Sequence, residues 1–330
     1  MEVFFPAYYH GFQCLAGTCP DSCCKEWTVD VDEEAAVRYR QLDGALGDRL
    51  RQVLTDTPDG TVMTIENGRC PMWRKDGLCR IQAELGHDAL CKTCRDFPRL
   101  THDYGDFVEL GLELSCPEAA RLILTSPGGL LVQAQPGGSE PEYDPDIMEI
   151  LRRSRKEALH FIRSAQNIPL ALAALLLYAH DVQAVLDGAD TICSTPEECA
   201  TELSQYRGTG DIASIFGFFQ TLEILTPQWK QRLETFAQRV TWNEPLRNLA
   251  CYMFERYWLQ AISDLDLVCR VKLTITACLL VGAMGGDTIR TAQLFSKEIE
   301  NDPDNVNAIL DGAYTSPALT DANLLALLML

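Results

Sequence analysis

The stretch that decides the class of this protein is Cys14-Leu15-Ala16-Gly17-Thr18-Cys19-Pro20-Asp21-Ser22-Cys23-Cys24, with four cysteines in one short segment. Thiolates are soft, anionic ligands that suit zinc and iron–sulfur clusters. Gly17 and Pro20 allow the backbone to turn sharply enough to aim several sulfurs at one point. The segment therefore predicts a metal site. Because adjacent residues point apart, we expect Cys23 and Cys24 to serve different roles or different metals.

Ten further cysteines complete the 14 of the chain, and they divide into two groups. The pair Cys91-x2-Cys94 alone is a weak signal of a zinc or redox site, but it gains weight beside the other N-terminal cysteines. The first group extends the predicted metal site and comprises Cys70, Cys79, Cys91, Cys94 and Cys116. The second group lies in apolar helical segments, where we expect buried core thiols, and comprises Cys193, Cys199, Cys251, Cys269 and Cys278.

The N-terminus indicates the compartment. Met1 to Pro6 has no basic start followed by an apolar run, so it is not typical of a secretory signal. We expect a cytoplasmic protein, in which clustered thiols are metal ligands more often than disulfides. A disulfide-rich protein of an oxidising compartment is the alternative. The longest apolar stretch, Ile168 to Tyr178, is shorter than the roughly 20 residues that span a bilayer, so no membrane association is predicted.

The charge of the chain excludes one class of partner. The formal net charge is -19 over 330 residues, and the acidic residues are spread along the whole chain. Such a surface repels nucleic acid and favours a basic or lysine-bearing partner. The same acidity could serve solubility alone.

The pattern of the chain predicts a mainly α protein in two domains. Residues 1–126 read as a small cysteine-rich, metal-organised domain with a helix over 32–54, a helix over 81–90 and short strands at 61–65 and 107–114. Glycines and prolines at 127–143 predict a linker. Residues 144–330 predict an all-helical domain, which starts where Asp144 can cap a helix and Pro145 can occupy its first turn. The predicted helices are 169–186, 211–225, 227–240, 244–263, 265–285, 288–300 and 321–330, after a first one from 144.

Several motifs carry a resemblance to a known family. They are Phe12-Gln13-Cys14, Cys23-Cys24-Lys25-Glu26-Trp27, Cys70-Pro71-Met72, Cys79-Arg80-Ile81-Gln82, Thr93-Cys94-Arg95-Asp96-Phe97-Pro98-Arg99, Leu114-Ser115-Cys116-Pro117-Glu118-Ala119-Ala120-Arg121 and Leu294-Phe295-Ser296-Lys297-Glu298-Ile299-Glu300. Together they resemble the flagellin lysine-N-methylase family, within the wider set of cysteine-rich zinc- or iron-chelating proteins. The similarity covers most of the chain and is most specific in its first 121 residues.

The resemblance implies an enzyme that methylates lysine side chains of flagellin, or of another lysine-bearing protein, with S-adenosylmethionine as methyl donor. It also implies an iron–sulfur cluster, of the 4Fe-4S type, with zinc as the alternative metal. Cys91 lies outside the motif, and we do not expect it to be a ligand. The matching cysteines exceed what one four-iron cluster needs, so either a second metal is present or some of them only line the site. They are Cys14, Cys19, Cys23, Cys24, Cys70, Cys79, Cys94 and Cys116.

Methyl transfer to lysine requires a neutral amine, since the ammonium has no lone pair and its ordinary pKa is near 10.4. Groups near the cysteine motifs that could assist proton loss are Tyr8, Tyr9, Asp96 and Tyr104, with His10 and Glu118 as further choices; each could equally be structural. Arg95 and Arg99 could bind the carboxylate of the donor or offset thiolate charge.

Two common donor-binding arrangements are excluded. The chain has no Gly-rich turn between a strand and a helix, so a doubly wound nucleotide-binding fold is not expected. The C-x3-C-x2-C spacing of radical enzymes would need a cysteine at position 26, where Glu26 stands. We therefore expect polar methyl transfer. The alternative function is a non-catalytic zinc- or iron-binding module whose helical domain docks a protein partner.

Overall fold

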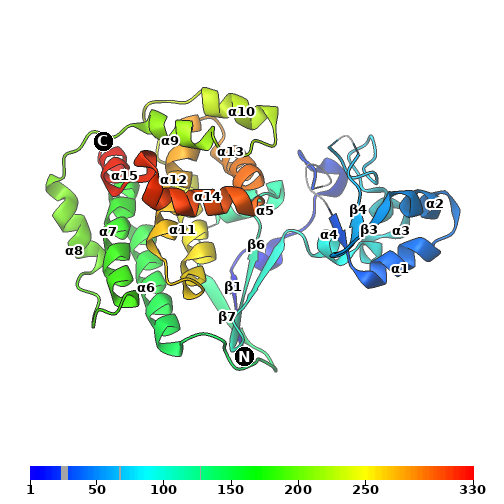
Figure 1. The fold of residues 1–330 in the computed structure, drawn as a ribbon, viewed down its shortest axis with the longest axis horizontal. Helices are drawn as coiled ribbons and strands as arrows, with labels where there is room; N and C mark the ends of the chain where they lie inside the picture. Colours follow the sequence, from blue (N-terminus) through cyan, green and yellow to red (C-terminus); the bar gives the residue numbers. More distant parts are fainter. Residues whose placement is uncertain (24–28, 67, 127) are drawn as a thin grey trace. The chain divides into compact units, whose positions relative to one another are not determined.

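The computed structural model describes the chain except for residues 24–28, 67 and 127 (Figure 1). It contains two compact units. The helical unit comprises Met1–His10, Thr101–Ser115 and Ala120–Leu330, and the cysteine-rich unit comprises Gly11–Leu100 and Cys116–Ala119. This division differs from the predicted domains 1–126 and 144–330, because strands on both sides of the cysteine-rich segment pair in one sheet.

That sheet has four strands in the order β5-β6-β1-β7. The N-terminal strand β1 (Glu2–Pro6) runs parallel to β6 (Phe107–Leu112) and antiparallel to β7 (Leu130–Ala134), and β5 (Arg99–Asp103) forms the edge beside β6. The prediction of a strand at 107–114 is confirmed. The predicted linker 127–143 is not all loop, because β7 pairs with β1 along its whole length.

Helix α6 (Pro145–Ser164) packs close to this sheet. Its start is fixed as predicted: the Asp144 carboxylate accepts hydrogen bonds from the backbone of Asp146 and Ile147, and Pro145 occupies the first turn. The Arg152 guanidinium lies over the rings of Phe4 and Phe107, at 5.2 and 4.8 Å from their centroids. Such cation–aromatic contacts join the helix to β1 and β6.

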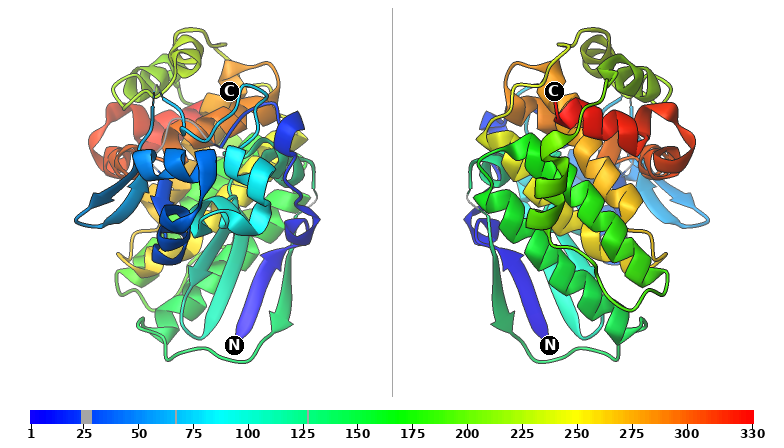
Figure 2. Two further views of the ribbon diagram at one scale, coloured as in Figure 1. Left: turned by 90° about the vertical axis from the view of Figure 1, so that its right-hand side faces the viewer. Right: turned by 90° about the vertical axis from the view of Figure 1, so that its left-hand side faces the viewer.

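The long helices of the helical unit pack side by side, with α6 next to α7 and α11, and α12 next to α7, α11 and α14 (Figures 1 and 2). Nearly every residue of α12 is buried. Residues 144–330, all of which the structure describes, contain only helices, as predicted. Two helices, α8 and α14, were not predicted. The remaining helices are α7 (Ile168–Leu186), α8 (Pro196–Glu202), α9 (Ile212–Phe219), α10 (Pro227–Glu234), α11 (Glu244–Tyr257), α12 (Val268–Met284), α13 (Thr288–Phe295), α14 (Pro303–Thr315) and α15 (Asp321–Leu328).

Helix α7 continues past the apolar stretch that ends at Tyr178 and reaches Leu186. By length and composition it could cross a membrane. Its contacts with α6, α8, α12 and α15, and the burial of most of its residues, are those of a core helix of the helical unit.

The cysteine-rich unit is a three-stranded sheet with short helices (Figure 2). The predicted helix over 32–54 is two helices, because Gly44 adopts a φ of +81° that breaks the run. The predicted helix over 81–90 likewise ends early, at Gly86, whose φ is +88°. The elements are β2 (Val29–Val31), α1 (Glu33–Gln41), α2 (Gly44–Val53), β3 (Leu54–Thr57), β4 (Gly60–Met63), α3 (Arg80–Leu85), α4 (Lys92–Asp96) and α5 (Pro117–Thr125), which begins in this unit.

Strand β4 confirms the predicted strand at 61–65 and pairs with both β2 and β3. One apolar core runs under this sheet, built from Val29, Tyr39, Leu50 and other buried side chains, with four cysteines in or against it. Thiols are thus part of the packing of this unit.

Candidate functional site

Four of the predicted ligands form one neighbourhood of thiols in the cysteine-rich unit. Cys14 and Cys23 are exposed, Cys19 is half-buried and Cys116 is buried. Burial raises the pKa of Cys19, and the nearby Cys14 and Cys23 raise it further. Burial raises the pKa of Cys116 to about 12, with Cys19 and Cys23 adding to the effect. Cys23 thus acts on the pKa of both Cys19 and Cys116.

The local backbone between Cys14 and Cys19 is tightly turned. A 3-10 helix spans Ala16–Thr18, and Ala16 adopts a φ of +47°, which is rare for a residue with a side chain. In this conformation the Ala16 amide donates a hydrogen bond to the Cys14 sulfur at 3.4 Å.

A second neighbourhood contains Cys70, Cys79, Cys91 and Cys94. The Cys94 thiol donates a hydrogen bond to Cys91, which lowers the pKa of Cys91 and raises that of Cys94. The nearby Cys79 acts to raise the pKa of Cys91, and the nearby Cys70 and Cys23 act to raise that of Cys94. Cys91, which the sequence motif leaves out, therefore lies among the predicted ligands.

Cys24 lies outside the described residues. Within the described part of the chain, no three or more histidine, cysteine, aspartate or glutamate side chains are arranged to hold a metal ion. The donor set fits a thiophilic metal by its chemistry, since soft thiols gather in two neighbourhoods that share Cys23. The described side chains do not form a closed coordination shell.

The predicted groups of the Thr93–Arg99 motif have partners within the cysteine-rich unit. The Asp96 carboxylate lies 3.9 Å from the Arg95 guanidinium and 3.8 Å from the Lys92 ammonium. The Arg99 guanidinium lies over the Phe12 ring, 5.3 Å from its centroid. Arg95 and Asp96 are partly exposed, so their charges remain accessible to a ligand.

The three predicted tyrosines lie in the helical unit. Tyr8 is buried near Glu255, Tyr252 and Arg163, and burial raises its pKa well above the ordinary value. Tyr9 packs edge-on against His10, with ring centroids 5.3 Å apart. These positions make Tyr8 part of a polar core, whereas Tyr9 belongs to an aromatic cluster.

Tyr104 stacks on Phe107 with ring centroids 4.7 Å apart. Burial raises its pKa, and the Glu109 carboxylate adds to the effect. Asp96 belongs to the other unit, so the structure does not place the four predicted catalytic residues in a single compact unit.

A buried ionic network, which the sequence did not reveal, begins at Glu109 on β6. Arg155 on α6 binds both oxygens of Glu109 and donates a further hydrogen bond to the Glu255 carbonyl at 3.0 Å. The Glu255 carboxylate in turn pairs with Arg163. Burial raises the pKa of Glu255 despite these cations.

A second branch of the network joins α11 to the turn that follows α13. Arg256 donates a hydrogen bond to the Tyr252 hydroxyl at 2.6 Å and lies 3.4 Å from the Glu300 carboxylate. The Tyr257 hydroxyl donates to the same carboxylate at 3.0 Å. Glu300 ends a π-helical turn, Ser296–Glu300, a rare element that is often found at functional sites. This turn is the C-terminal motif that carried the family resemblance.

Two charges of this second branch, Arg256 and Glu300, act on the pKa of Glu113, which directly follows β6. Burial raises its pKa, the Arg256 cation opposes that effect, and Glu300 reinforces it. The Ser115 hydroxyl donates a hydrogen bond to its carboxylate at 3.2 Å. A sequence signal for it existed, since Glu113 is a lone charge in the apolar run Leu110 to Leu114.

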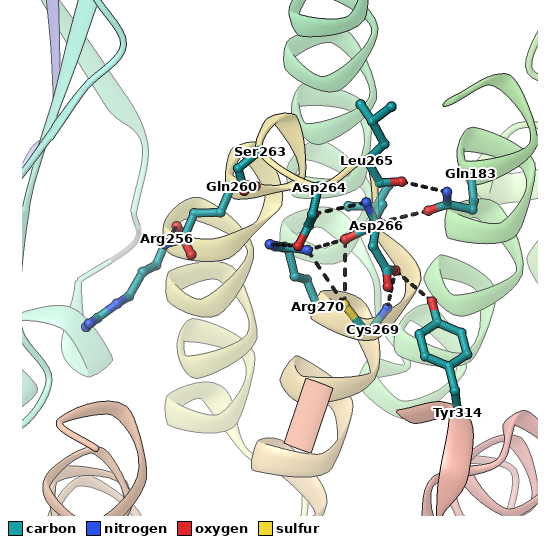
Figure 3. Close-up of polar contacts among 11 residues, drawn as sticks. Gln183, Arg256, Gln260, Ser263, Asp264, Leu265, Asp266, Cys269, Arg270 and Tyr314 are labelled. Atoms are coloured by element: carbon teal, nitrogen blue, oxygen red, sulfur yellow. Dashed lines mark hydrogen bonds and ion pairs between the residues drawn. The ribbon is translucent and has the colours of Figure 1, made fainter. Parts of the chain in front are cut away.

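A third polar cluster fixes the turn before α12 (Figure 3). Leu265 adopts a φ of +59°. Gln183 on α7 donates to the Leu265 carbonyl at 2.7 Å and accepts from the Leu267 amide at 2.8 Å, while Arg270 pairs with Asp264 at 2.8 Å. Both hydrogen bonds from the Gln183 side chain go to the backbone of this turn, and the cluster serves to hold it.

Four of the five C-terminal cysteines are buried as expected: Cys199, Cys251, Cys269 and Cys278. The prediction is wrong for Cys193, which is exposed in the segment between α7 and α8.

Comparison with known proteins finds three similar chains. Over 143 residues, 39% of this chain, it is 32% identical to the flagellar biosynthetic protein FliU of Salmonella muenchen, and the match covers 81% of that protein. It is also 32% identical over 143 residues to the lysine-N-methylases of Salmonella typhimurium and Salmonella choleraesuis. The match covers 34% of each of these two longer proteins. No protein-family model and no solved structure matches the chain.

Proposed function

Because this chain belongs to the flagellin lysine-N-methylase family, we propose that it is a protein-lysine N-methyltransferase acting on flagellin in the cytoplasm. The observation that carries the proposal is the 143-residue match to two lysine-N-methylases and a flagellar protein. The acidic chain, with a formal net charge of -19, suits a lysine-bearing substrate.

The methyl donor in this proposal is S-adenosylmethionine. Arg95 and Arg99 are the groups assigned to its carboxylate, because guanidinium groups bind carboxylates through two parallel hydrogen bonds. Arg99 over the Phe12 ring supports this role, since that contact fixes the direction of the guanidinium. Asp96 beside Arg95 competes for the same cation, so a bound carboxylate would need to displace it or share it.

We assign an iron–sulfur cluster to the cysteine-rich unit, held by ligands from Cys14, Cys19, Cys23, Cys24, Cys70, Cys79, Cys94 and Cys116. A cluster of this kind, when bound, would supply a Lewis-acidic iron and rigid cross-links between loops. The support is the chemistry of the donors and the two thiol neighbourhoods that share Cys23. Zinc is the alternative metal for the same thiols.

The acceptor lysine must be neutral when it attacks the donor methyl group. A site of low polarity favours the amine over the ammonium, and a nearby base takes the proton. Tyr8 and Tyr104 have phenol pKa values raised by burial, so each is a hydrogen-bond donor rather than a base near neutral pH. Tyr9 and Asp96 remain the other predicted contributors.

The test is methyl transfer by protein purified without oxygen. Labelled S-adenosylmethionine is supplied with flagellin, and flagellin with acetylated lysines is the matched control. Label on lysine in the first sample alone is the expected result. If label stays absent from lysine while the protein is fully metal-loaded, the chain is a metal-binding module that docks a partner. Zinc without a visible absorption band would overturn the iron–sulfur assignment alone.

A further inference from the structure

Strand β7 forms one edge of the four-stranded sheet, beside β1 (Figure 2). At one end of this pair, the Met1 ammonium donates to the Gln135 carbonyl at 3.2 Å, and the Gln135 amide donates to the Met1 carbonyl at 3.0 Å. At the other end, the Ala7 amide donates to the Gly129 carbonyl at 3.1 Å. In an antiparallel ladder every second residue bonds to the partner strand in this way. The residues between them face away from β1.

The outward-facing residues of β7 are Leu130, Val132 and Ala134. Among the described residues, their outward backbone groups have no hydrogen-bond partner within the chain, because no other strand lies beyond β7 in the sheet. Each of the three offers one N–H donor and one C=O acceptor. The edge can thus pair with one further extended strand.

The sequence of this edge does not discourage such pairing. Edge strands are usually protected by charged side chains, prolines or bulges. Residues 126–139 contain no charged side chain, and β7 itself contains no proline. Leu131 and Val132 are 51% and 56% exposed, although both are large and apolar. An uncovered strand of this kind is typical of an edge that a partner completes.

The two exposed side chains continue the apolar faces of the sheet. In the register of the pair, Leu131 lies opposite Phe5, which belongs to a buried apolar cluster on β1 and β6. Val132 lies opposite Phe4, on the other face. Directly opposite residues share a face, and successive residues alternate between faces. Alternate apolar side chains of an added strand would therefore be covered beside Leu131 and Val132.

The end of the sheet at Ala134 is acidic. Glu2 lies opposite Ala134 in the register. The segment that follows β7 passes this end of the sheet, since the Ser139 amide donates to the Gly105 carbonyl at 2.9 Å. Five exposed carboxylates gather here from β1, the turn between β5 and β6, and this segment: Glu2, Asp103, Asp106, Glu140 and Glu142.

A basic segment is the occupant that fits this charge. The cations at the same end are Arg152, whose guanidinium lies 3.8 Å from the Glu2 carboxylate, and the Met1 ammonium, so carboxylates remain in excess. A second copy of this chain would bring the same acidic end and a further net charge of -19, which repels at long range. A lysine-bearing strand is attracted instead.

We propose that β7 docks an extended, lysine-bearing segment of the acceptor protein, which adds to the sheet as a fifth strand. Main-chain hydrogen bonds to the outward groups of β7 supply affinity, and the side chains beside Leu131 and Val132 supply specificity. Lysines near the Ala134 end meet the carboxylates. This inference rests on the proposed lysine methylation and deepens it, because it concerns how the acceptor is held and not where the methyl group is transferred.

The experiment measures binding of short, labelled, overlapping peptides that tile flagellin, by fluorescence anisotropy with the full chain. Lysine-bearing peptides should bind. Val132→Pro removes an outward N–H, and an edge strand tolerates proline at such a position. The variant should bind these peptides about tenfold more weakly or worse, because the partner carbonyl loses its donor. Val132→Thr keeps the donor and the branched side chain, so this matched control should stay within about twofold of wild type.

A second comparison tests the charge of the occupant. Glu140→Gln combined with Glu142→Gln should weaken binding at low salt, and the difference from wild type should fade at high salt because exposed charges are screened. The matched control combines Glu234→Gln with Asp311→Asn, which removes two exposed charges from α10 and α14. Equal effects of the two double variants would overturn the assignment of a basic occupant.

Peptides with methylated backbone amides test strand addition without any change to the protein. Methylation of one alternate set of amides should abolish binding, and methylation of the other set should not, because only one edge of an added strand faces β7. Equal loss or no loss with both sets would contradict strand addition. This comparison decides the matter if circular dichroism shows that Val132→Pro is misfolded.

The remaining outcomes separate docking from methylation. Unchanged binding in a folded Val132→Pro, or no binding of any peptide, would overturn docking at β7 and leave lysine methylation to its own assay. A wild-type dimer that Val132→Pro converts to a monomer would overturn the acceptor as occupant and assign the edge to a second copy. If the peptides bind as expected but the wild type transfers no methyl group to lysine, the proposed function fails and β7 stands as a peptide-binding edge.

Discussion

Arg155 binds both carboxylate oxygens of Glu109, and the two side chains are only 7% and 10% exposed. The pair joins β6 to α6 in the interior of the helical unit. Removing one partner of a buried ion pair leaves the other charged and unpaired, which costs far more than losing an exposed pair.

Arg155→Met should therefore lower the free energy of unfolding by about 3–5 kcal/mol. The matched control is Arg153→Met on the same helix, where the guanidinium lies 3.9 Å from Glu157 and both side chains are largely exposed. That change should cost no more than about 1 kcal/mol. Urea unfolding followed by circular dichroism measures both, and equal costs would contradict the importance of the buried pair.

A second pair of variants tests the metal-binding thiols. Cys23→Ser should lower the metal content of anaerobically purified protein, because Cys23 belongs to both thiol neighbourhoods. Cys193→Ser removes a thiol that is also exposed but lies in the helical unit, so metal content should not change. Metal analysis with the absorption spectrum measures both. An equal loss of metal in the two variants would show that exposed thiols bind metal wherever they lie in the chain, and it would contradict a specific role for Cys23.

Gln183→Ala should destabilise the helical unit by about 1–3 kcal/mol, because it removes both hydrogen bonds that hold the turn at Leu265 and leaves their backbone groups unpaired. Gln231→Ala replaces an exposed glutamine on α10 and should stay within about 0.5 kcal/mol of wild type. Thermal unfolding compares the two. A negligible effect of Gln183→Ala would mean that the turn at Leu265 is stable without the two hydrogen bonds from Gln183.

The Asp321 carboxylate stabilises the fold by an amount that depends on pH. A hydrogen bond from His180 and the Lys272 ammonium lower the pKa of Asp321 from 3.8 to about 2. A carboxyl group with a lowered pKa stabilises the fold above its unfolded pKa, and this stabilisation disappears as the pH falls from about 4 towards 2. Because 39% of the side chain is exposed, the gain is at most about 1 kcal/mol.

Asp321→Asn should consequently be less stable than wild type at pH 6, and the difference should shrink at pH 3. Asp311→Asn on the exposed face of α14 is the control for removing a charge. Urea midpoints at the two pH values measure the change. If the difference in stability between wild type and Asp321→Asn stayed constant down to pH 2, the stabilisation would come from packing of the side chain and not from its charge.

Local signals predicted much of the fold. The Asp144-Pro145 dipeptide fixed the start of α6, because a side-chain cap and a proline act within one turn. The helix expected over 32–54 failed at Gly44, where a single residue with φ of +81° outweighs the apolar period. Strand β7 was missed because five residues between glycine-rich turns carry little pattern, and pairing with β1 supplies what the local sequence lacks.

The candidate site was predictable only where its parts are close in sequence. The cysteine motifs stood out because several thiols lie within a few residues of one another. Glu109 and Arg155 are far apart in the chain, as are Tyr252 and Glu300. Each reads as an ordinary charged or aromatic residue until the fold brings the two pairs together. For Cys91 the local motif was misleading. Cys91 lies outside the family motif and was not expected to be a ligand, yet it shares a hydrogen bond with the predicted ligand Cys94.

Most of the cysteine-rich unit, Gly11–Leu100, is an insertion between neighbours in one sheet, since β1 precedes it and β6 follows it in the chain. During synthesis, 100 residues (7–106) separate the end of β1 from the start of its parallel partner β6. One cut of the chain cannot release either unit whole. A fragment ending at residue 126 would carry Glu109 without Arg155, and β1 without β7. Removing the insert Gly11–Leu100 would require a new loop in its place and would still leave Cys116–Ala119, the other part of the cysteine-rich unit, in the chain.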